Sequence, residues 1–445
     1  MNGVWPIPPV VVDLNDVLYI TIRNNLSVAA ALHTHGLFQN KTFYQDGAAH
    51  VTECGIAPQT SYTYTIKASQ SGCYWFHGHL GGHYVDGFRT PFIIRESEAE
   101  KALLPVYDYD VTLGFADWYH REHEDLIKDF LNPANPNGDE PIPASVILQN
   151  SIGLGPDNSL NLVAGKRYRI RLISMSAFAA FNFWIDGHDF EIFEVDGIPI
   201  TPYRLDSLPL SPAQRYSILL TAKSTTFNYY LHADIEQGML PSPAPYPFFK
   251  LALMYNPNFQ FYPSQPLPDT IWQFDQSLFS PLQKIDAFPL TKSSTFTLNV
   301  TFQVYPEDGI SRGAFNQNPY SYPRVPSALS ALTNSTLVEN AQFYGSKTSA
   351  SVLKPLETVQ IIINNYDEGG HPFHLHGHAF QVLYTGLGVY DPSNDLNTLQ
   401  LSNPLRRDTT VVPGRGHAVL RFVADNPGVW LFHCHIECTC RFCKM

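Results

Sequence analysis

Four His-x-His pairs constrain this chain more than any other feature of its sequence. The pairs are His33/His35, His77/His79, His374/His376 and His433/His435. Alternate side chains of a β-strand point to one face, so each pair directs two imidazoles the same way. Eight imidazoles in four such pairs predict a cluster of several metal ions. Imidazole suits copper, zinc, iron and nickel, and Cys434 inside the last pair narrows the choice towards zinc or copper.

The composition favours a large protein built from many short strands. At 445 residues the chain is long enough for about three domains. It contains 35 Pro, 24 Tyr and 29 Phe, while only 15% of its residues are charged. The net charge of −12 argues against a nucleic-acid partner, because phosphate binding requires clustered Lys and Arg. The sequence has no run of 18 apolar residues, so it does not predict a transmembrane helix, and no signal peptide is visible.

Short strands with turn residues between them are expected in three successive segments. The first contains strands at 10–12, 17–22, 61–66, 74–77 and 92–94. The second contains strands at 167–173, 216–220 and 229–233, with a short helix at 122–131. After the Pro-rich stretch 256–268, strands are expected at 295–302, 358–364, 379–384, 418–423 and 429–432. This pattern favours β-sandwiches or Greek-key barrels.

Two other features bear on the cellular compartment. Cys54 and Cys73 are separated from the four cysteines within residues 434–443, and the sequence does not decide whether they pair. Asn-x-Ser/Thr triplets, which also arise by chance, would suit a secreted glycoprotein. They begin at Asn25, Asn40, Asn299 and Asn334.

The four histidine motifs resemble, in order and separation, the copper motifs of the multicopper oxidases. They read LHTHG from residue 32, YWFHGH from 74, HPFHLHGH from 371 and HCHIE from 433. The resemblance implies an all-β protein of three cupredoxin-like Greek-key domains, at 1–96, 97–256 and 257–445. The first and third domains would hold the metal, with the second as a spacer.

The resemblance also implies four copper ions and their ligands. His33 and His374 would hold the type 2 ion, and His371 with Cys434 the type 1 ion. The remaining imidazoles would hold the type 3 pair, namely His35, His77, His79, His376, His433 and His435. Because His433 and His435 flank Cys434, an electron at the type 1 ion has a short covalent path to the cluster. Asp46 and Glu437 match acidic positions, to which we assign proton delivery for the four-electron reduction of O2.

Further motifs resemble those of fungal iron-uptake ferroxidases. They are GLFQN from residue 36, EPIP from 140 and RRDT from 406. Fe(II) favours oxygen ligands, and Asp367, Asp186 and Asp275 are candidates for binding it. The alternative is a laccase that oxidises phenols, with these carboxylates as solvated loop residues. By the same resemblance we expect an extracellular or cell-surface location, and an iron permease is a possible partner.

The end of the chain departs from the family pattern. After Glu437 the family continues with an aromatic residue and the second type 1 histidine, whereas this chain has Cys438 and Thr439. A blue copper site requires two imidazoles and one thiolate. We therefore expect either an incomplete or misread gene product, or a form in which Cys438, Cys440 or Cys443 replaces the ligand. A third functional alternative follows, a redox-crippled copper-binding protein with little or no oxidase activity.

Overall fold

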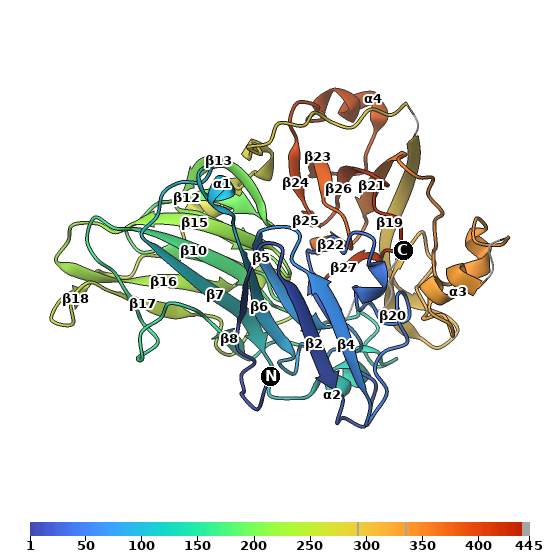
Figure 1. The fold of residues 1–445 in the computed structure, drawn as a ribbon, viewed down its shortest axis with the longest axis horizontal. Helices are drawn as coiled ribbons and strands as arrows, with labels where there is room; N and C mark the ends of the chain where they lie inside the picture. The colour runs from blue at the N-terminus through green and yellow to red at the C-terminus, as the bar shows by residue number, and fades with distance from the viewer. Residues whose placement is uncertain (292, 334–335, 438–445) are drawn as a thin grey trace.

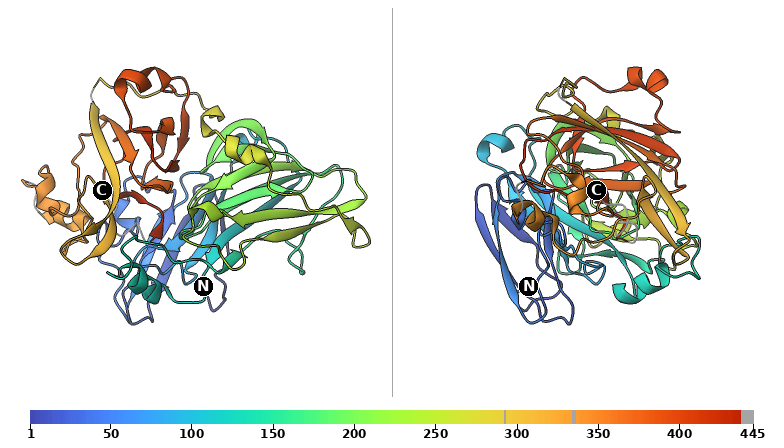
Figure 2. Two further views of the ribbon diagram at one scale, coloured as in Figure 1. Left: turned by 180° about the vertical axis from the view of Figure 1, so that it is seen from behind. Right: turned by 90° about the vertical axis from the view of Figure 1, so that its right-hand side faces the viewer.

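The chain folds into three units, each made of two β-sheets. A computed structural model describes residues 1–291, 293–333 and 336–437 (Figure 1). We name the units by their strands: the N-terminal unit comprises β1–β6, the middle unit β7–β18 and the C-terminal unit β19–β27. The blue N-terminal strands lie beside the red C-terminal strands in both views of Figure 2, and the left view shows the middle unit extending to one side.

The N-terminal unit pairs a four-stranded sheet, β1-β6-β5-β3, with the two-stranded sheet β2-β4. In β4 the side chains of Tyr64 and Ile66 are buried while their neighbours face solvent, as alternation in a half-buried strand requires. The strand bounds are β1 Val10–Asp13, β2 Val17–Arg23, β3 Leu32–His35, β4 Ser61–Lys67, β5 Gly72–Gly78 and β6 Arg89–Arg95.

The middle unit contains the largest core of the molecule, which fills the space between two longer sheets. Their strand orders are β13-β12-β15-β10-β7-β8 and β14-β11-β16-β17-β9, with β18 beside β16. The bounds are β7 Tyr109–Trp118, β8 Ser145–Leu148, β9 Leu160–Asn161, β10 Arg167–Ser174, β11 Phe181–Ile185, β12 Phe190–Val195, β13 Ile198–Leu205, β14 Ser207–Leu210, β15 Arg215–Thr221, β16 Phe227–Ile235, β17 Lys250–Met254 and β18 Gln260–Phe261.

The C-terminal unit packs a six-stranded sheet, β20-β19-β21-β26-β23-β24, against the short sheet β25-β22-β27. The short sheet carries the C-terminal histidine motifs. The bounds are β19 Ser293–Tyr305, β20 Ile310–Phe315, β21 Thr358–Asn365, β22 His371–Leu375, β23 Phe380–Leu387, β24 Leu405–Arg407, β25 Thr409–Val412, β26 Gly416–Val423 and β27 Phe432–Cys434.

Helices are short and lie in the connections between strands. The α-helices are α1 Glu98–Lys101, α2 His123–Phe130, α3 Ser327–Thr333 and α4 Pro392–Asp395. The 3-10 helices are η1 Phe43–Gln45, η2 Gln237–Met239, η3 Asp269–Gln273, η4 Gln276–Leu278, η5 Ala341–Tyr344 and η6 Leu396–Thr398. Within the described ranges, the helices are all too short or too polar to cross a membrane.

The structure confirms the all-β prediction and most of the predicted strands, and it confirms the helix as α2. The strand expected at 429–432 was placed too early, because β27 begins at Phe432 and continues to Cys434. The same-face argument holds within a single strand only for His33 and His35. His79, His376 and His435 each follow the last residue of their strand. The boundaries at residues 96 and 256 stay a prediction.

Candidate metal centre

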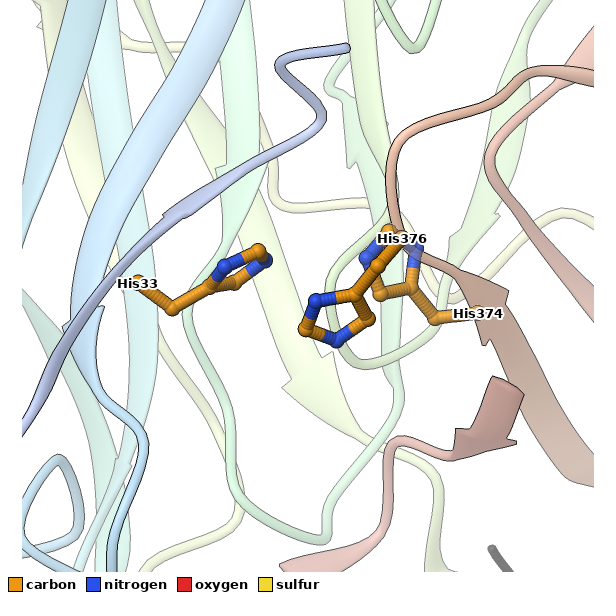
Figure 3. A group of neighbouring side chains, drawn as sticks. All are labelled: His33, His374 and His376. Carbon is orange, nitrogen blue, oxygen red and sulfur yellow. The ribbon is translucent and has the colours of Figure 1, made fainter. Parts of the chain in front are cut away.

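Strand pairing brings the eight imidazoles of the four pairs together. In the N-terminal unit His33 lies opposite His77 across β3 and β5, and in the C-terminal unit His374 lies opposite His433 across β22 and β27. The two sheets face each other, so imidazoles from opposite ends of the chain meet. The ring centroids of His35 and His374 are 3.8 Å apart, and those of His33 and His376 are 4.1 Å apart. Figure 3 shows His33 pointing towards His374 and His376 from the other side.

The cluster is shielded from water. Seven of its imidazoles are buried and His79 is half-buried. Burial, together with the charges of neighbouring imidazoles, lowers the pKa of His77, His376 and His435 well below the usual histidine value. Burial and His374 do the same to the pKa of His35, against the opposing effect of Asp408. These imidazoles are therefore neutral, which is the form that binds metal.

The outward nitrogens of several rings are held by backbone carbonyls. Nδ1 of His33 donates to the carbonyl of Asp46 at 2.7 Å, and Nδ1 of His374 to the carbonyl of Asp408 at 2.9 Å. His77 and His433 donate in the same way, to Gly78 at 3.0 Å and to Cys434 at 2.8 Å. Such bonds fix the tautomer, so that Nε2 carries the lone pair that can bind a metal.

The inward nitrogens fit a metal cluster. Buried polar atoms without a partner are rare in folded proteins and need an explanation. Several nitrogens of this centre are buried without a hydrogen bond: Nε2 of His33, His77 and His374, Nδ1 of His35, and both nitrogens of His435. Three all-histidine groups have ligand atoms within 4.8 Å of one another, namely His33/His374/His376, His33/His35/His77 and His79/His376/His433. A bound metal ion would satisfy the one lone pair that each neutral imidazole carries.

Asp46 and Glu437, predicted to deliver protons, both lie beside the cluster. Asp46 is fully buried, and Nδ1 of His376 donates to its Oδ2 at 2.8 Å. The next residue, Gly47, has φ +76°, and a Cβ there would lie 1.8 Å from the carbonyl oxygen of Leu32. Only glycine lets the Asp46 turn approach β3 so closely. Glu437 lines a small pocket together with His79 and His433. Their role in proton delivery stays a proposal.

The predicted type 1 ligands form a separate pair on the other side of β27. Nδ1 of His371 lies 3.5 Å from Sγ of Cys434, and both residues are buried. Among the described residues, no group of three or more possible ligands includes Cys434. Thr439 and the cysteines after it lie outside the described residues. Cys54 and Cys73, whose pairing the sequence left open, are both free, Cys54 exposed and Cys73 buried.

The three predicted iron carboxylates lie in different surroundings. Asp367 is 34% exposed, and its Oδ2 accepts a hydrogen bond from Nε2 of His371 at 3.0 Å. Asp186 is fully buried in the middle unit, where its Oδ1 accepts from Nε2 of His232 at 3.0 Å. The Asp275 side chain caps the short helix η4. Only Asp367 among them contacts a predicted copper ligand, and the assignment of all three to iron stays a prediction.

Sequence reasoning missed two acidic residues near these sites. Half-buried Glu140 lies close enough to Asp367 for the charges to interact, and burial followed by that charge raises its pKa to about 8. Asp408 contacts both His35 and His374 through Oδ1, at 3.2 and 3.4 Å. Both residues belong to the quoted motifs EPIP and RRDT. The motifs were the available signal, but strand patterns alone do not place these loops.

Comparison with protein families agrees with this geometry. The chain matches sequence profiles described as multicopper oxidase over three stretches, residues 1–99, 109–246 and 317–440. Together these stretches contain all eight imidazoles of the cluster, His371 and Cys434.

Individual relatives point the same way. The chain is 38% identical to the iron multicopper oxidase fer1 of Mycosarcoma maydis, over 98% of this chain and 74% of that protein. It is 34% identical to the iron transport multicopper oxidase FET3 of Saccharomyces cerevisiae, over 98% and 69%. Among solved structures, Fet3p, a multicopper oxidase that functions in iron import, superposes with a TM-score of 0.93 at 32% identity, covering 100% of this chain and 85% of that one. A laccase from Botrytis aclada gives 0.83 at 26%, covering 100% and 82%.

Proposed function

The chain belongs to the multicopper oxidase family, and from that premise we propose that it couples the one-electron oxidation of Fe(II) to the four-electron reduction of O2 to water. Its domains are cupredoxin-like, as predicted, and it is a copper-dependent oxidoreductase that uses O2. The family binds copper as type 1, type 2 and type 3 ions. Bound copper would supply the one-electron acceptors and the site at which O2 is reduced.

The observation that carries the choice of Fe(II) is the contact between Asp367 and His371. A cation bound at the Asp367 carboxylate would lie one hydrogen bond away from an imidazole that itself approaches Cys434. Although burial raises the pKa of Asp367, the hydrogen bond and charge of His371 lower it, so this carboxyl is ionised at neutral pH. The site thus combines a negative charge, partial exposure and a direct path to the type 1 ligands.

Glu140 would complete the substrate site. Its pKa of about 8 reflects burial and the nearby negative charge of Asp367. A cation placed between the two carboxyls would remove that repulsion and displace the Glu140 proton. Two carboxylates suit Fe(II), which favours oxygen ligands, whereas oxidation of a phenol does not require them.

From this site the electron route follows the chain itself. Four Fe(II) ions would each give one electron, which passes through His371 and Cys434 and then along the backbone to His433 and His435. One O2 takes four electrons and four protons to form two waters. Asp46 and Glu437 would supply the protons. An extracellular or cell-surface location and an iron permease partner belong to the same proposal.

The experiment compares substrates in matched variants. In copper-loaded protein we expect four Fe(II) oxidised per O2 consumed. Asp367→Asn and Glu140→Gln should each raise the KM for Fe(II) about 10-fold or more. In Glu140→Gln the kcat/KM for a phenol such as 2,6-dimethoxyphenol should stay within about two-fold of wild type, because a neutral substrate does not bind through this charge and Glu140 does not contact His371.

Glu368 provides the control. It adjoins Asp367, is 79% exposed and pairs with Arg415, so Glu368→Gln removes a neighbouring charge without touching His371. This variant should keep the wild-type KM for Fe(II). Equal effects of Asp367→Asn and Glu368→Gln would refute the site, and oxidation of the phenol without oxidation of Fe(II) would favour the laccase alternative.

A further inference from the structure

The three units meet at a buried ion pair between Arg215 and Asp408. Arg215 begins β15 of the middle unit, and Asp408 links β24 to β25 in the C-terminal unit. The guanidinium donates from Nη1 to Oδ1 of Asp408 at 2.7 Å and from Nη2 to Oδ2 at 2.5 Å. Arg215 is fully buried and Asp408 almost so. Such a bidentate pair fixes the orientation of both groups as well as their separation.

Arg215 also contacts the N-terminal unit. Its Nε donates to the carbonyl of Cys73 at 3.1 Å, on the same strand that carries His77. Gly36, which follows His35, adjoins the ion pair: a Cβ there would lie 2.5 Å from Nη2 of Arg215 and 2.9 Å from Oδ2 of Asp408. The absence of a side chain at residue 36 is therefore what gives the pair room next to β3.

Asp408, held in place by Arg215, contacts two imidazoles of the cluster. Its Oδ1 accepts a hydrogen bond from Nε2 of His35 at 3.2 Å and lies 3.4 Å from Nδ1 of His374. The Thr409 hydroxyl donates to the same oxygen at 2.8 Å and lies 3.2 Å from Nδ1 of His374. With these nitrogens engaged, Nδ1 of His35 and Nε2 of His374 are the ones left facing the cluster.

We propose that Arg215 is a positioning residue of the metal centre: by binding both oxygens of Asp408, it sets which nitrogen of His35 faces the metal and helps to orient His374, whose tautomer the Asp408 carbonyl fixes. The middle unit supplies no ligand, yet through Arg215 it determines the geometry of ligands from the other two units. His35 is turned the opposite way from His33 and His77, which present Nε2. The inference rests on the proposed copper centre.

A second arginine of the middle unit supplies a matched control. Arg169 lies on β10, the strand paired with β15, and is as fully buried as Arg215. It pairs with two carboxylates, Glu96 and Glu194, each at 2.6 Å. Within the part of the chain that the structure describes, the side-chain partners of these acids are Arg169, Arg171 and Ser217, and no cluster histidine is among them. Replacing either arginine with lysine removes a buried guanidinium that contacts carboxylates through both Nη atoms, but only the change at Arg215 should affect the metal.

The test compares Arg215→Lys with Arg169→Lys in copper-loaded full-length protein. Lysine keeps the charge but cannot form the two-pronged contact. Both variants should lower Tm. Arg215→Lys alone should shift the hyperfine splitting of the type 2 copper EPR signal and lower the copper content of the cluster at least about two-fold. An unchanged signal and copper content in Arg215→Lys, or an equal change in Arg169→Lys, would overturn the inference.

If Arg215→Lys does not fold, Thr409→Val is the second variant. It is close to isosteric and removes only the hydroxyl that contacts Asp408, His374 and Nε2 of His35. We expect a smaller shift of the same EPR signal, and wild-type parameters would refute the proposal. Wild-type protein that shows no type 2 signal would instead overturn the copper centre itself, and this inference with it.

Discussion

The histidine cluster and the Cys434–His371 pair lie on opposite sides of β27 but differ in construction. The cluster takes imidazoles from both ends of the chain, and buried carboxylates hold it, Asp46 from the N-terminal unit and Asp408 from the C-terminal unit. The pair takes both residues from the C-terminal unit, and its carboxylate neighbour Asp367 is 34% exposed.

We infer from this difference that the two sites have different roles in the proposed reaction. A buried site keeps larger reductants away from its imidazoles, and a small pocket beside His79 and His433 adjoins it. A pair that reaches the surface through one carboxylate can receive electrons from a hydrated cation. Since Cys434 adjoins His433, the two sites are joined by covalent bonds while their surroundings remain separate.

The separation of the two sites makes a strong prediction about metal content. His376→Ala removes an imidazole shared by two of the candidate ligand groups, so the protein should lose about two copper ions. Cys434→Ser should remove only the copper with blue absorption and leave the cluster loaded. Elemental analysis with EPR measures both. If either substitution emptied the whole protein of copper, the two sites would not be independent.

The Asp46→Asn variant tests whether the histidine cluster takes part only in the reaction with O2. Asp46→Asn keeps the shape of the side chain but removes the charge that accepts from Nδ1 of His376. In stopped-flow experiments, reoxidation by O2 should slow about 10- to 100-fold. Reduction by Fe(II) should be unchanged, because Asp46 lies on the side of β27 away from His371. Slowing of both phases to the same extent would contradict the division between the sites.

The sequence predicted the cluster better than its surroundings. The His-x-His spacing and the alternation in segments such as 61–66 and 167–173 are local properties, and local properties can be read without a fold. The family resemblance then supplied the pairing of distant motifs. The last strand was placed wrongly because the apolar run 429–432 resembles a strand, whereas β27 pairs with β22 only from Phe432.

Sequence patterns could not predict contacts between residues of different units. Arg215 lies 193 positions before Asp408, and nothing in the spacing around either residue indicates the other. Glu140 follows an irregular loop, and its approach to Asp367 depends on how that loop packs. The sequence therefore identified the imidazoles that come together in the structure, while the groups that contact them became visible only in three dimensions.

A glutamate with a raised pKa lies near each of two aspartates: Glu140 near Asp367 of the proposed Fe(II) site, and Glu53 near Asp46 of the histidine cluster. Burial raises the pKa of Glu53 from 4.5 to about 7, against an opposing hydrogen bond from Tyr64, and the charge of Asp46 adds to the rise. The native state thus keeps a proton up to about pH 7, while the unfolded chain releases it near 4.5. Native protein binds more protons within this window, so the free energy of unfolding falls as the pH rises through it.

Glu53→Gln should remove this dependence, since glutamine stays neutral and its carbonyl can still accept the Tyr64 hydroxyl. From pH 5 to pH 8 the wild type should lose about 2 kcal/mol more stability than the variant, a value reduced for the partial exposure of Glu53. Urea unfolding at both pH values measures the difference, with Glu307→Gln, at an exposed site, as the control. Parallel pH profiles for wild type and Glu53→Gln would show that Glu53 is ionised in the native state, contrary to this prediction.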